Sequence, residues 1–165
     1  LVGLGLDGVL KDVAESDTPL MGICLGMQLM MTESEEFGSH RGLGIIEGGV
    51  SRLQVHQGES RTLKVPQVGW NRIHNPQPDH DGEVWGATLL SEIPDGEYMY
   101  FVHSYFARPA DDSVVTSVTS YGPSSFCSSV QKGSVFACQF HPERSGLQGL
   151  KMYQNLARML ESKRS

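Results

Sequence analysis

The sequence has few of the residues on which several classes of protein depend. It holds only three cysteines in 165 residues, Cys24, Cys127 and Cys138, and no two of them form a CxxC pair. Neither a disulfide framework nor a metal site is therefore indicated, and a reducing cytoplasm fits best. Thirteen Lys and Arg against nineteen Asp and Glu leave a net charge of -6. This balance argues against nucleic acid as a partner.

A long apolar run is also missing. The longest stretch, residues 19–31 (PLMGICLGMQLMM), is much shorter than the roughly 20 apolar residues that cross a bilayer. A length of 165 residues and a hydrophobic content of 39% predict one soluble globular domain. The chain begins with Leu1 and shows no cleavable leader pattern. We therefore expect residues 1–165 to be one domain that is incomplete at its N-terminus.

Apolar spacing predicts a mixed α/β chain. Residues 6–13 have the period of an amphipathic helix, and residues 20–24 and 25–32 predict a buried strand that turns directly into a helix. A last helix begins at Ser145 with an apolar stripe. The stretch 75–83 predicts a polar loop. Short β-branched or alternating runs predict strands at 50–55, 62–65, 97–105, 114–120, 126–131 and 134–140.

The clearest chemical signal is Gly22-Ile23-Cys24-Leu25-Gly26, at the predicted strand-to-helix turn. A nucleophile on such a turn needs small residues two before and two after it, because bulkier ones would clash with the backbone. The helix N-terminus favours a thiolate and predicts a lowered Cys24 pKa, and the Leu25 N–H is a candidate oxyanion donor. The pattern alone also fits a buried apolar cysteine.

A cysteine nucleophile needs a base, and the sequence holds six histidines. His141 follows the apolar run 134–140, with Glu143 two residues on, where a carboxylate can orient the imidazole. Taken alone, the HPE sequence also fits a solvated loop. His103 is the rival base, although no carboxylate follows it closely. The other four histidines are expected at the surface: His40, His56, His74 and His80.

Together these residues resemble the class I (triad) glutamine amidotransferases. Five segments are similar to the glutaminase subunits of imidazole glycerol phosphate synthases, in order along the chain from about Pro19 to its end: GICLGMQ, SEEFGSHRGLGIIEG, VPQVGWNRI, YFVHSYF and FACQFHPERSG. The resemblance implies a flavodoxin-like three-layer α/β domain with a central, mostly parallel sheet and antiparallel hairpins over about 50–120. It also implies that an N-terminal βαβ segment, with its second oxyanion donor, is missing.

The resemblance also implies the roles of individual residues. Cys24 is the nucleophile, His141 the base and then the acid, and Glu143 the orienting group, with no metal or organic cofactor. Gln28 and Glu36 stand where the family holds the amide and the α-amino group of glutamine, and a carboxylate suits an ammonium. The main chain around His103, Ser104 and Tyr105 meets the backbone end of the substrate.

A partner is implied as well, because released ammonia is lost by protonation in water unless an acceptor synthase captures it. In the family this acceptor is typically a (β/α)8-barrel cyclase, and Trp70, Tyr100 and Arg144 stand at positions that face it. Two residues depart from the family pattern on that side: Gln67 replaces a usual His, and Arg144 follows HPE where Lys is usual.

Three alternatives remain open on the sequence. The 126–130 run and the 149–153 segment are slightly more similar to a paralogous amidotransferase that feeds a sugar-modifying synthase of surface polysaccharide assembly. A truncated, catalytically silent subunit is the second. A cysteine peptidase of the same fold is the third, and it is disfavoured because Gln28 and Glu36 match a pocket for a small amino acid.

Overall fold

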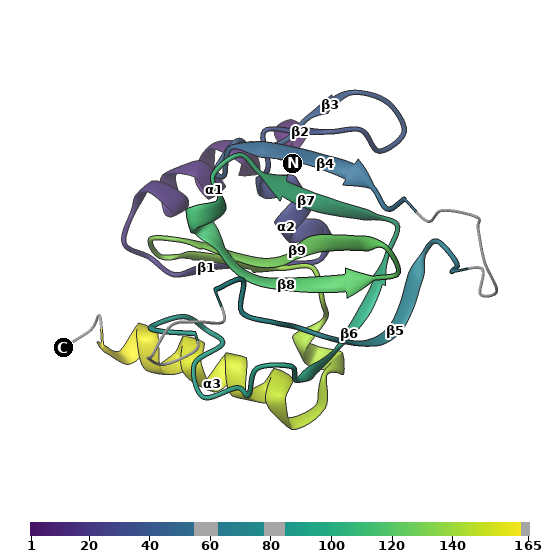
Figure 1. Cartoon of the computed structure of the whole chain (residues 1–165). Helices are drawn as coiled ribbons and strands as arrows, with labels where there is room; N and C mark the ends of the chain where they lie inside the picture. Colours follow the sequence, from purple (N-terminus) through teal and green to yellow (C-terminus); the bar gives the residue numbers. More distant parts are fainter. Residues whose placement is uncertain (55–62, 78–84, 163–165) are drawn as a thin grey trace.

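The computed structural model describes residues 1–54, 63–77 and 85–162 of the chain (Figure 1). Its α-helices are α1 (Leu6–Glu15), α2 (Leu25–Met30) and α3 (Gly146–Ser162), with short 3-10 turns η1 (Val2–Leu4), η2 (Asp112–Val114) and η3 (Pro142–Arg144). Its strands are β1 (Leu20–Ile23), β2 (Glu33–Ser34), β3 (His40–Arg41), β4 (Gly48–Arg52), β5 (Gln67–Arg72), β6 (Tyr98–His103), β7 (Tyr105–Pro109), β8 (Val115–Tyr121), β9 (Ser124–Lys132) and β10 (Val135–Cys138). The mixed α/β class is as predicted.

The central sheet has the strand order β1-β10-β9-β8. Only its β1–β10 pair is parallel, whereas β10–β9 and β9–β8 are antiparallel. The expectation of a mostly parallel sheet is therefore wrong for the described residues. The reason is local, because the two connections are turns of two residues, which can join only antiparallel neighbours. Gly122 and Gly133 supply the positive φ that each turn requires.

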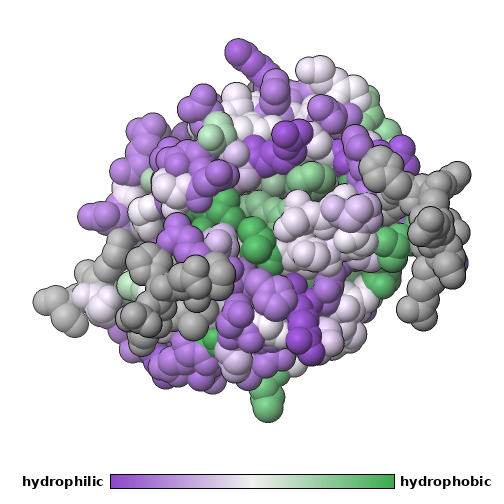
Figure 2. Space-filling view, viewed as in Figure 1, coloured by the Kyte–Doolittle hydropathy of each residue, from purple (hydrophilic) through white to green (hydrophobic). Residues whose placement is uncertain are grey.

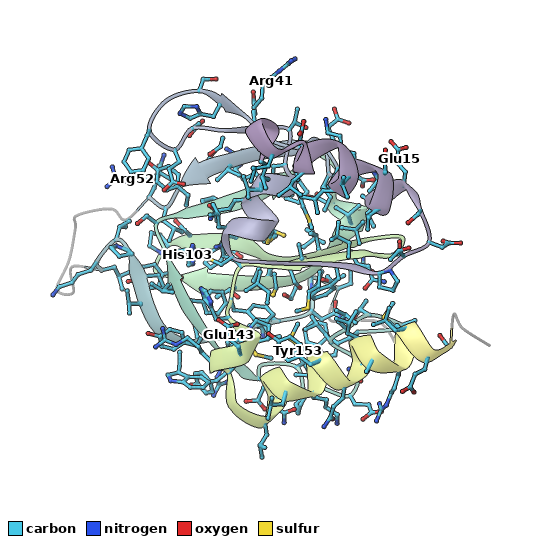
Figure 3. All side chains as sticks on the ribbon, turned by 180° about the vertical axis from the view of Figure 1, so that it is seen from behind. Glu15, Arg41, Arg52, His103, Glu143 and Tyr153 are labelled. Atoms are coloured by element: carbon cyan, nitrogen blue, oxygen red, sulfur yellow. The ribbon has the colours of Figure 1, made fainter. Side chains whose placement is uncertain are left out.

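Helices cover both faces of the central sheet, which makes three layers (Figures 1 and 3). Strand β10 shows why, since all four of its residues are buried. Phe136 and Cys138 pack in one core cluster with Met152 of α3. Val135 and Ala137 pack in the other cluster with residues of α2. Burial on both faces explains the continuous apolar run in this part of the sequence.

Two smaller sheets flank this core, one of order β3-β2-β4-β7 and one made by β5 and β6. The strand predicted at 97–105 is divided at Ser104, so that β6 and β7 belong to different sheets. Strand β5 was not predicted, because a Gly at position 69 and polar residues at its ends obscure its alternation.

Other predicted boundaries shift for equally local reasons. Residues 63–65 form no strand and lead into Pro66, which has no N–H to give to a ladder. Position 62 and most of the predicted loop 75–83 lie outside the described residues, as do His56 and His80. Among the described helices, none has both the length and the apolar character required to span a bilayer.

Candidate active site

Cys24 is the single residue that connects the end of β1 to the start of α2. Its backbone has φ 50 and ψ -102, a conformation that costs a non-glycine residue energy and that is characteristic of a nucleophile elbow. The Cys24 N–H donates to the carbonyl of Cys138 at 2.7 Å, and the Cys24 carbonyl accepts from the N–H of Gln28 at 3.2 Å. The strained turn is thus tied on one side to β10 and on the other to α2.

The two glycines of the elbow differ in what surrounds them. A Cβ at Gly22 would lie 2.9 Å from the Met30 methyl carbon and 3.0 Å from the backbone of Gly26, so that this position must stay small, as predicted. A Cβ at Gly26 would meet no atom of the described residues within 4 Å. The expected clash is therefore wrong for Gly26, because this residue begins a helix whose outer side is open.

His141 and Glu143 form the pair that the HPE sequence predicted. The His141 Nδ1 and the Glu143 Oε1 are 2.7 Å apart. The backbone around them is held by Ser145, whose hydroxyl donates to the His141 carbonyl at 2.6 Å and accepts from the N–H of Tyr100 at 3.0 Å. The His141 N–H also donates to the Tyr100 carbonyl at 2.9 Å. Strand β6 therefore positions the imidazole, and nothing in the sequence signalled the part that Ser145 plays.

The second imidazole nitrogen of His141, Nε2, is available to accept a proton. Because the carboxylate of Glu143 can only accept, Nδ1 carries the proton and Nε2 is the acceptor. This Nε2 is buried and has no hydrogen-bond partner in the described part of the chain. A buried acceptor without a partner is costly, and such atoms are typical of functional sites.

A cavity of about 310 Å³ opens beside Cys24. In Figure 3, Glu143 is labelled at the turn that leads into α3, and His103 is labelled on the same side of the molecule, above that turn. The predicted substrate residues share the cavity, although they come from α2, the loop after β2, β6 and β7. Its lining consists of Cys24, Leu25, Gln28, Glu36, Pro66, Val102, His103, Ser104 and Tyr105. Pro66 and Val102 were not predicted, and neither has a polar side chain that could have signalled a role.

Gln28 lies at the cavity, but its amide nitrogen is already engaged. Nε2 donates to the Tyr105 carbonyl at 2.9 Å and to Oε1 of Gln139 at 3.1 Å. Both amide hydrogens are thus used within the protein, and only the Gln28 oxygen remains free to accept from a ligand. Glu36 keeps its carboxylate at the cavity wall, where it gives the site an acidic group.

His103 is buried among aromatic rings and does not resemble a base. Its Nδ1 lies 2.8 Å from the Tyr105 carbonyl and its Nε2 lies 3.1 Å from the Gln67 side chain. Burial lowers the pKa of His103 to about 4, which keeps the ring neutral. His103, the alternative candidate for the base, therefore has a structural role: it lines the cavity and is hydrogen-bonded to the buried side chain of Gln67.

The thiols differ sharply in their surroundings. Burial raises the pKa of Cys24, against a lowering by the Leu25 N–H and by the Gln139 amide. The predicted depression of the Cys24 pKa is therefore wrong for the unliganded protein, because desolvation outweighs the helix N-terminus. Burial raises the pKa of Cys127 to about 12 and that of Cys138 well above its ordinary value. Both remain unreactive thiols.

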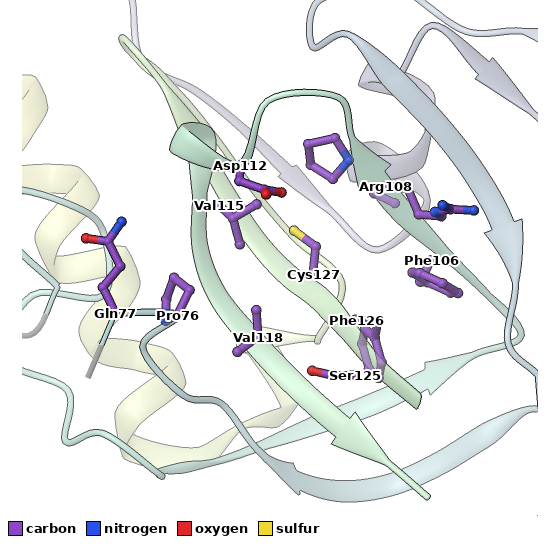
Figure 4. A pocket seen from close by; sticks show the side chains of 12 residues that line it. Pro76, Gln77, Phe106, Arg108, Asp112, Val115, Val118, Ser125, Phe126 and Cys127 are labelled. Atoms are coloured by element: carbon purple, nitrogen blue, oxygen red, sulfur yellow. The ribbon is translucent and has the colours of Figure 1, made fainter. Parts of the chain in front are cut away.

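A second and larger cavity, of about 690 Å³, lies on another face, between β7 and β8 (Figure 4). Figure 2 shows an apolar hollow at the centre of the face seen in Figure 1. Phe106, Val118 and Phe126 line this cavity, with Arg108 and Asp112 among its polar residues. Its cysteine, Cys127, is a buried thiol that no histidine among the lining residues could activate.

The residues predicted to meet a partner gather at the antiparallel strand pair β5–β6. Trp70 and Tyr100 are paired across the strands, and their rings meet edge to face at 5.9 Å. The Arg144 guanidinium lies over the Tyr100 ring at 4.2 Å. Trp70 is 55% exposed, and Val68, Tyr98 and Val102 of the same strand pair are exposed too. Trp70 is therefore a surface residue and not part of the core.

Two of the four histidines expected at the surface lie within the described residues, and both are accessible. His40 is exposed, and the His74 side chain is 46% exposed, with its Nδ1 3.5 Å from Asp95. Within the described residues, no group of three or more His, Cys, Asp and Glu side chains is arranged to hold a metal ion.

Comparison with known proteins decides the family. The family model for class-I glutamine amidotransferases matches residues 7–159. The chain belongs to this family. It is 42% identical over 154 residues to the imidazole glycerol phosphate synthase subunit HisH of Chlorobium luteolum, an alignment that covers 93% of this chain and 70% of that protein. It is 44% identical over 155 residues to the protein of the same name from Syntrophotalea carbinolica, with the same coverage of both chains.

A solved structure supports the fold of this amidotransferase. A candidate GMP synthase subunit from Thermoplasma acidophilum superimposes with a TM-score of 0.59 at 17% identity, over 98% of this chain and 67% of that one. A sequence identity this low supports only a shared fold. The protein is thus an enzyme of the glutamine amidotransferase class. Its Cys24 lies at the turn between β1 and α2.

Proposed function

We propose that the protein is the glutaminase subunit of an imidazole glycerol phosphate synthase and acts in histidine biosynthesis. One observation supports this most strongly: a chain about 40% identical to such subunits has a strained cysteine elbow, and the carboxylate that acts on the Cys24 thiol by its charge, Glu143, binds a histidine whose Nε2 is free. In this proposal Cys24, His141 and Glu143 form a catalytic triad that hydrolyses glutamine to glutamate and ammonia.

The geometry supports a thioester mechanism. Nε2 of His141 accepts the Cys24 proton, and the sulfur attacks the side-chain amide carbon of glutamine. The tetrahedral intermediate collapses when His141 returns the proton to the departing nitrogen, which leaves as ammonia. Water then attacks the glutamyl thioester, again with His141 as base, and releases glutamate and the thiol. Glu143 keeps the proton on Nδ1 and stabilises the imidazolium between these steps.

Charge and polarity in the cavity suit glutamine as the substrate. The Glu36 carboxylate is the group that would pair with the α-ammonium. The main chain of Ser104 and Tyr105 would meet the backbone end of the substrate, and the Gln28 oxygen would accept from it. The Leu25 N–H, at the first position of α2, would donate to the oxyanion.

A partner follows from the product. Ammonia that escapes into water is protonated, so that a useful glutaminase must pass it directly to an acceptor enzyme. In this proposal the acceptor is a cyclase subunit with a (β/α)8-barrel fold, which forms a heterodimer with the glutaminase and receives the ammonia through a channel. The exposed face of the β5–β6 strand pair with Trp70 and Tyr100, together with Arg144, would be the contact surface.

The relatives favour this acceptor over the alternatives. Both proteins compared above carry the imidazole glycerol phosphate synthase name, whereas neither name refers to a polysaccharide synthase. Three free thiols are consistent with the expected cytoplasmic location. The proposal requires no metal or organic cofactor, because the thiol performs the covalent step.

The test is a pair of activity measurements on the purified protein. Glutamate release is measured with and without the cyclase subunit of the same organism, and imidazole glycerol phosphate formation is measured with both subunits and glutamine. We expect glutamine-dependent product only when both subunits are present. Glutaminase activity that supports an aminated sugar but not the imidazole product would contradict the histidine assignment. Complete absence of glutamine hydrolysis in the complex would favour a silent subunit.

A further inference from the structure

Gln139 is a polar residue in an apolar stretch, and it touches the nucleophile. Its side chain is fully buried, and its Nε2 lies 3.5 Å from the Cys24 sulfur. Its backbone N–H donates to the Ser128 carbonyl at 2.9 Å, so that β9 fixes its main chain. The carbonyl of the preceding residue, Cys138, accepts the N–H of Cys24. The end of β10 therefore holds both the backbone and the side chain of the elbow.

The orientation of the Gln139 amide follows from its neighbours. The Tyr105 carbonyl can only accept, so the group that faces it must be the amide nitrogen of Gln28. The second hydrogen of that nitrogen needs an acceptor, which is Oε1 of Gln139. The Nε2 of Gln139 must then face the sulfur of Cys24. This chain of two amides presents a fixed N–H to the nucleophile.

The resting thiol has a second contact, which favours its protonated form. The Cys24 thiol donates to the Val102 carbonyl at 3.8 Å. When the proton leaves, that contact is lost, and the N–H of Gln139 still donates to the sulfur. A donor on a buried anion is a charge-assisted hydrogen bond, which is about twice as strong as a neutral one.

We propose that Gln139 is a positioning residue that donates a hydrogen bond to the Cys24 thiolate and holds it ready for attack, and that Gln28 keeps Gln139 in the orientation this requires. The purpose of the contact rests on the proposed glutaminase function. The contact itself is independent of glutamine, and so is its test.

The test is the pH dependence of Cys24 alkylation by iodoacetamide, which reacts with the thiolate. The rate of modification at Cys24 is followed by peptide mass spectrometry from pH 6 to pH 10. Gln139→Met removes the donor without adding charge and with little change of volume. Gln28→Met leaves Gln139 in place but releases its orientation. Gln131→Met is the matched control, because Gln131 lies on the neighbouring strand β9 and donates to the Ala87 carbonyl.

Other ionisable groups near the sulfur are the same in every variant. Burial is the largest cause that raises the pKa of Cys24, and the charges of Glu143 and Glu36 raise it further. A difference between variants therefore reports on the amide. Three titratable groups share the cavity with Cys24: Glu36 after β2, His103 of β6 and Tyr105 of β7. Cys138 of β10 and Glu143 of η3 interact with the Cys24 thiol by their charge, and His141 stands directly before η3.

We expect Gln139→Met to raise the apparent pKa of alkylation by about one pH unit, which lowers the thiolate fraction at neutral pH about tenfold. Gln28→Met should shift it in the same direction by less, and Gln131→Met should leave it unchanged. The difference in alkylation rate between the four proteins should narrow as the pH approaches 10, where more of the thiol is ionised in each of them. In the glutaminase assay, kcat should fall in Gln139→Met with KM preserved, since Gln139 is buried behind the cavity.

A folded Gln139→Met or Gln28→Met protein with the wild-type alkylation profile would overturn the proposal and assign Gln139 to packing alone. Folding is checked by thermal melting, and if Gln139→Met does not fold, the Gln28→Met profile decides. A shifted profile in a protein without glutaminase activity would support the positioning role and reject the proposed function. A wild-type alkylation profile in a variant that comes from an active glutaminase would reject the positioning role and leave the proposed function supported.

Discussion

At the scale of single residues, the site depends on environment more than on residue type. The three cysteines share one chemistry, but only Cys24 is partly accessible, strained and close to an amide donor. The imidazoles of His103 and His141 differ in the same way. One is enclosed by rings and neutral, and the other is bound to a carboxylate at 2.7 Å with its second nitrogen free.

The first prediction concerns the nucleophile. A glutamine analogue that carries an electrophile should label Cys24 and leave Cys127 and Cys138 unmodified, because the latter two are buried and their pKa values are raised. Digestion and mass spectrometry locate the label. Labelling of Cys138 with an unmodified Cys24, or full glutaminase activity in Cys24→Ala, would refute the assignment.

The second prediction concerns the triad. Cys24→Ala and His141→Ala should each lower kcat on the order of ten thousand-fold, and the double variant should cost little more, because a triad acts as one unit. Glu143→Gln should cost less, since it weakens the orientation of Nδ1 but leaves Nε2 in place. Steady-state glutamate release with the partner present measures all four. If His103→Ala abolished activity and His141→Ala did not, the base would be misassigned.

The third prediction is a pH dependence of stability. The pKa of His103 lies near 4 in the folded protein, below its ordinary 6.5. The unfolded chain therefore binds a proton first as the pH falls, so this contribution to stability is complete above pH 6.5 and is lost between pH 6.5 and about 4. The loss amounts to roughly 3 kcal/mol in the free energy of unfolding.

Urea denaturation of the wild type and of His103→Gln at about pH 7.5 and about pH 4.5 measures this effect. The wild type should lose more stability on acidification than the variant. His74→Gln is the control, because the His74 side chain is largely exposed. An equal acid loss in wild type and His103→Gln would show that His103 titrates in the folded protein as it does in the unfolded chain.

At the scale of elements, strand β10 organises the site. It is the parallel partner of β1, it accepts the backbone N–H of Cys24, and it leads through Gln139 to His141. Both faces of β10 are buried between α2 and α3, so the strand has little freedom to move. The proposed nucleophile Cys24 and the proposed base His141 therefore follow two neighbouring strands, β1 and β10, and groups held by such rigid elements suit catalysis.

The fourth prediction tests the elbow that joins β1 to α2. Gly22→Ala should lower the free energy of unfolding by about 1–3 kcal/mol, because its Cβ meets the Met30 side chain and the Gly26 backbone at 3.0 Å or less. Gly26→Ala is the matched control and should be neutral or stabilising by up to about 1 kcal/mol, since its Cβ points into open space within a helix. Urea denaturation compares them. Equal effects of the two substitutions would contradict the packing asymmetry.

At the scale of the whole molecule, the candidate site and the exposed β5–β6 strand pair share strand β6. Tyr100 of strand β6 contacts Arg144 and Trp70 through its ring. The backbone of the same strand accepts the His141 N–H at Tyr100 and the Cys24 thiol at Val102. A partner bound to the β5–β6 strand pair would therefore contact the strand that positions the proposed catalytic groups. This gives a physical route by which complex formation can change glutaminase activity.

The fifth prediction tests that surface. Arg144→Glu should weaken binding of the cyclase subunit at least about tenfold, because it removes the cation over Tyr100 and reverses a charge beside the aromatic pair. Partner-stimulated glutaminase activity should fall as well, while the melting temperature stays near that of the wild type. Arg41→Glu, a charge reversal on the exposed strand β3, is the control. Unchanged affinity of Arg144→Glu in a calorimetric titration would remove Arg144 from the interface.

The sequence by itself determined the parts of this protein that depend on local chemistry. Small residues around Cys24 indicate a strand-to-helix turn, and a carboxylate two residues after His141 indicates an oriented base, because both relations lie within a few residues. Only the tertiary structure decided the remainder. Cys24 and Gln139 are 115 positions apart, and burial of the Cys24 thiol outweighs the local helix effect on its pKa. Such contacts and such desolvation arise only when distant strands pack, and no spacing in the sequence encodes them.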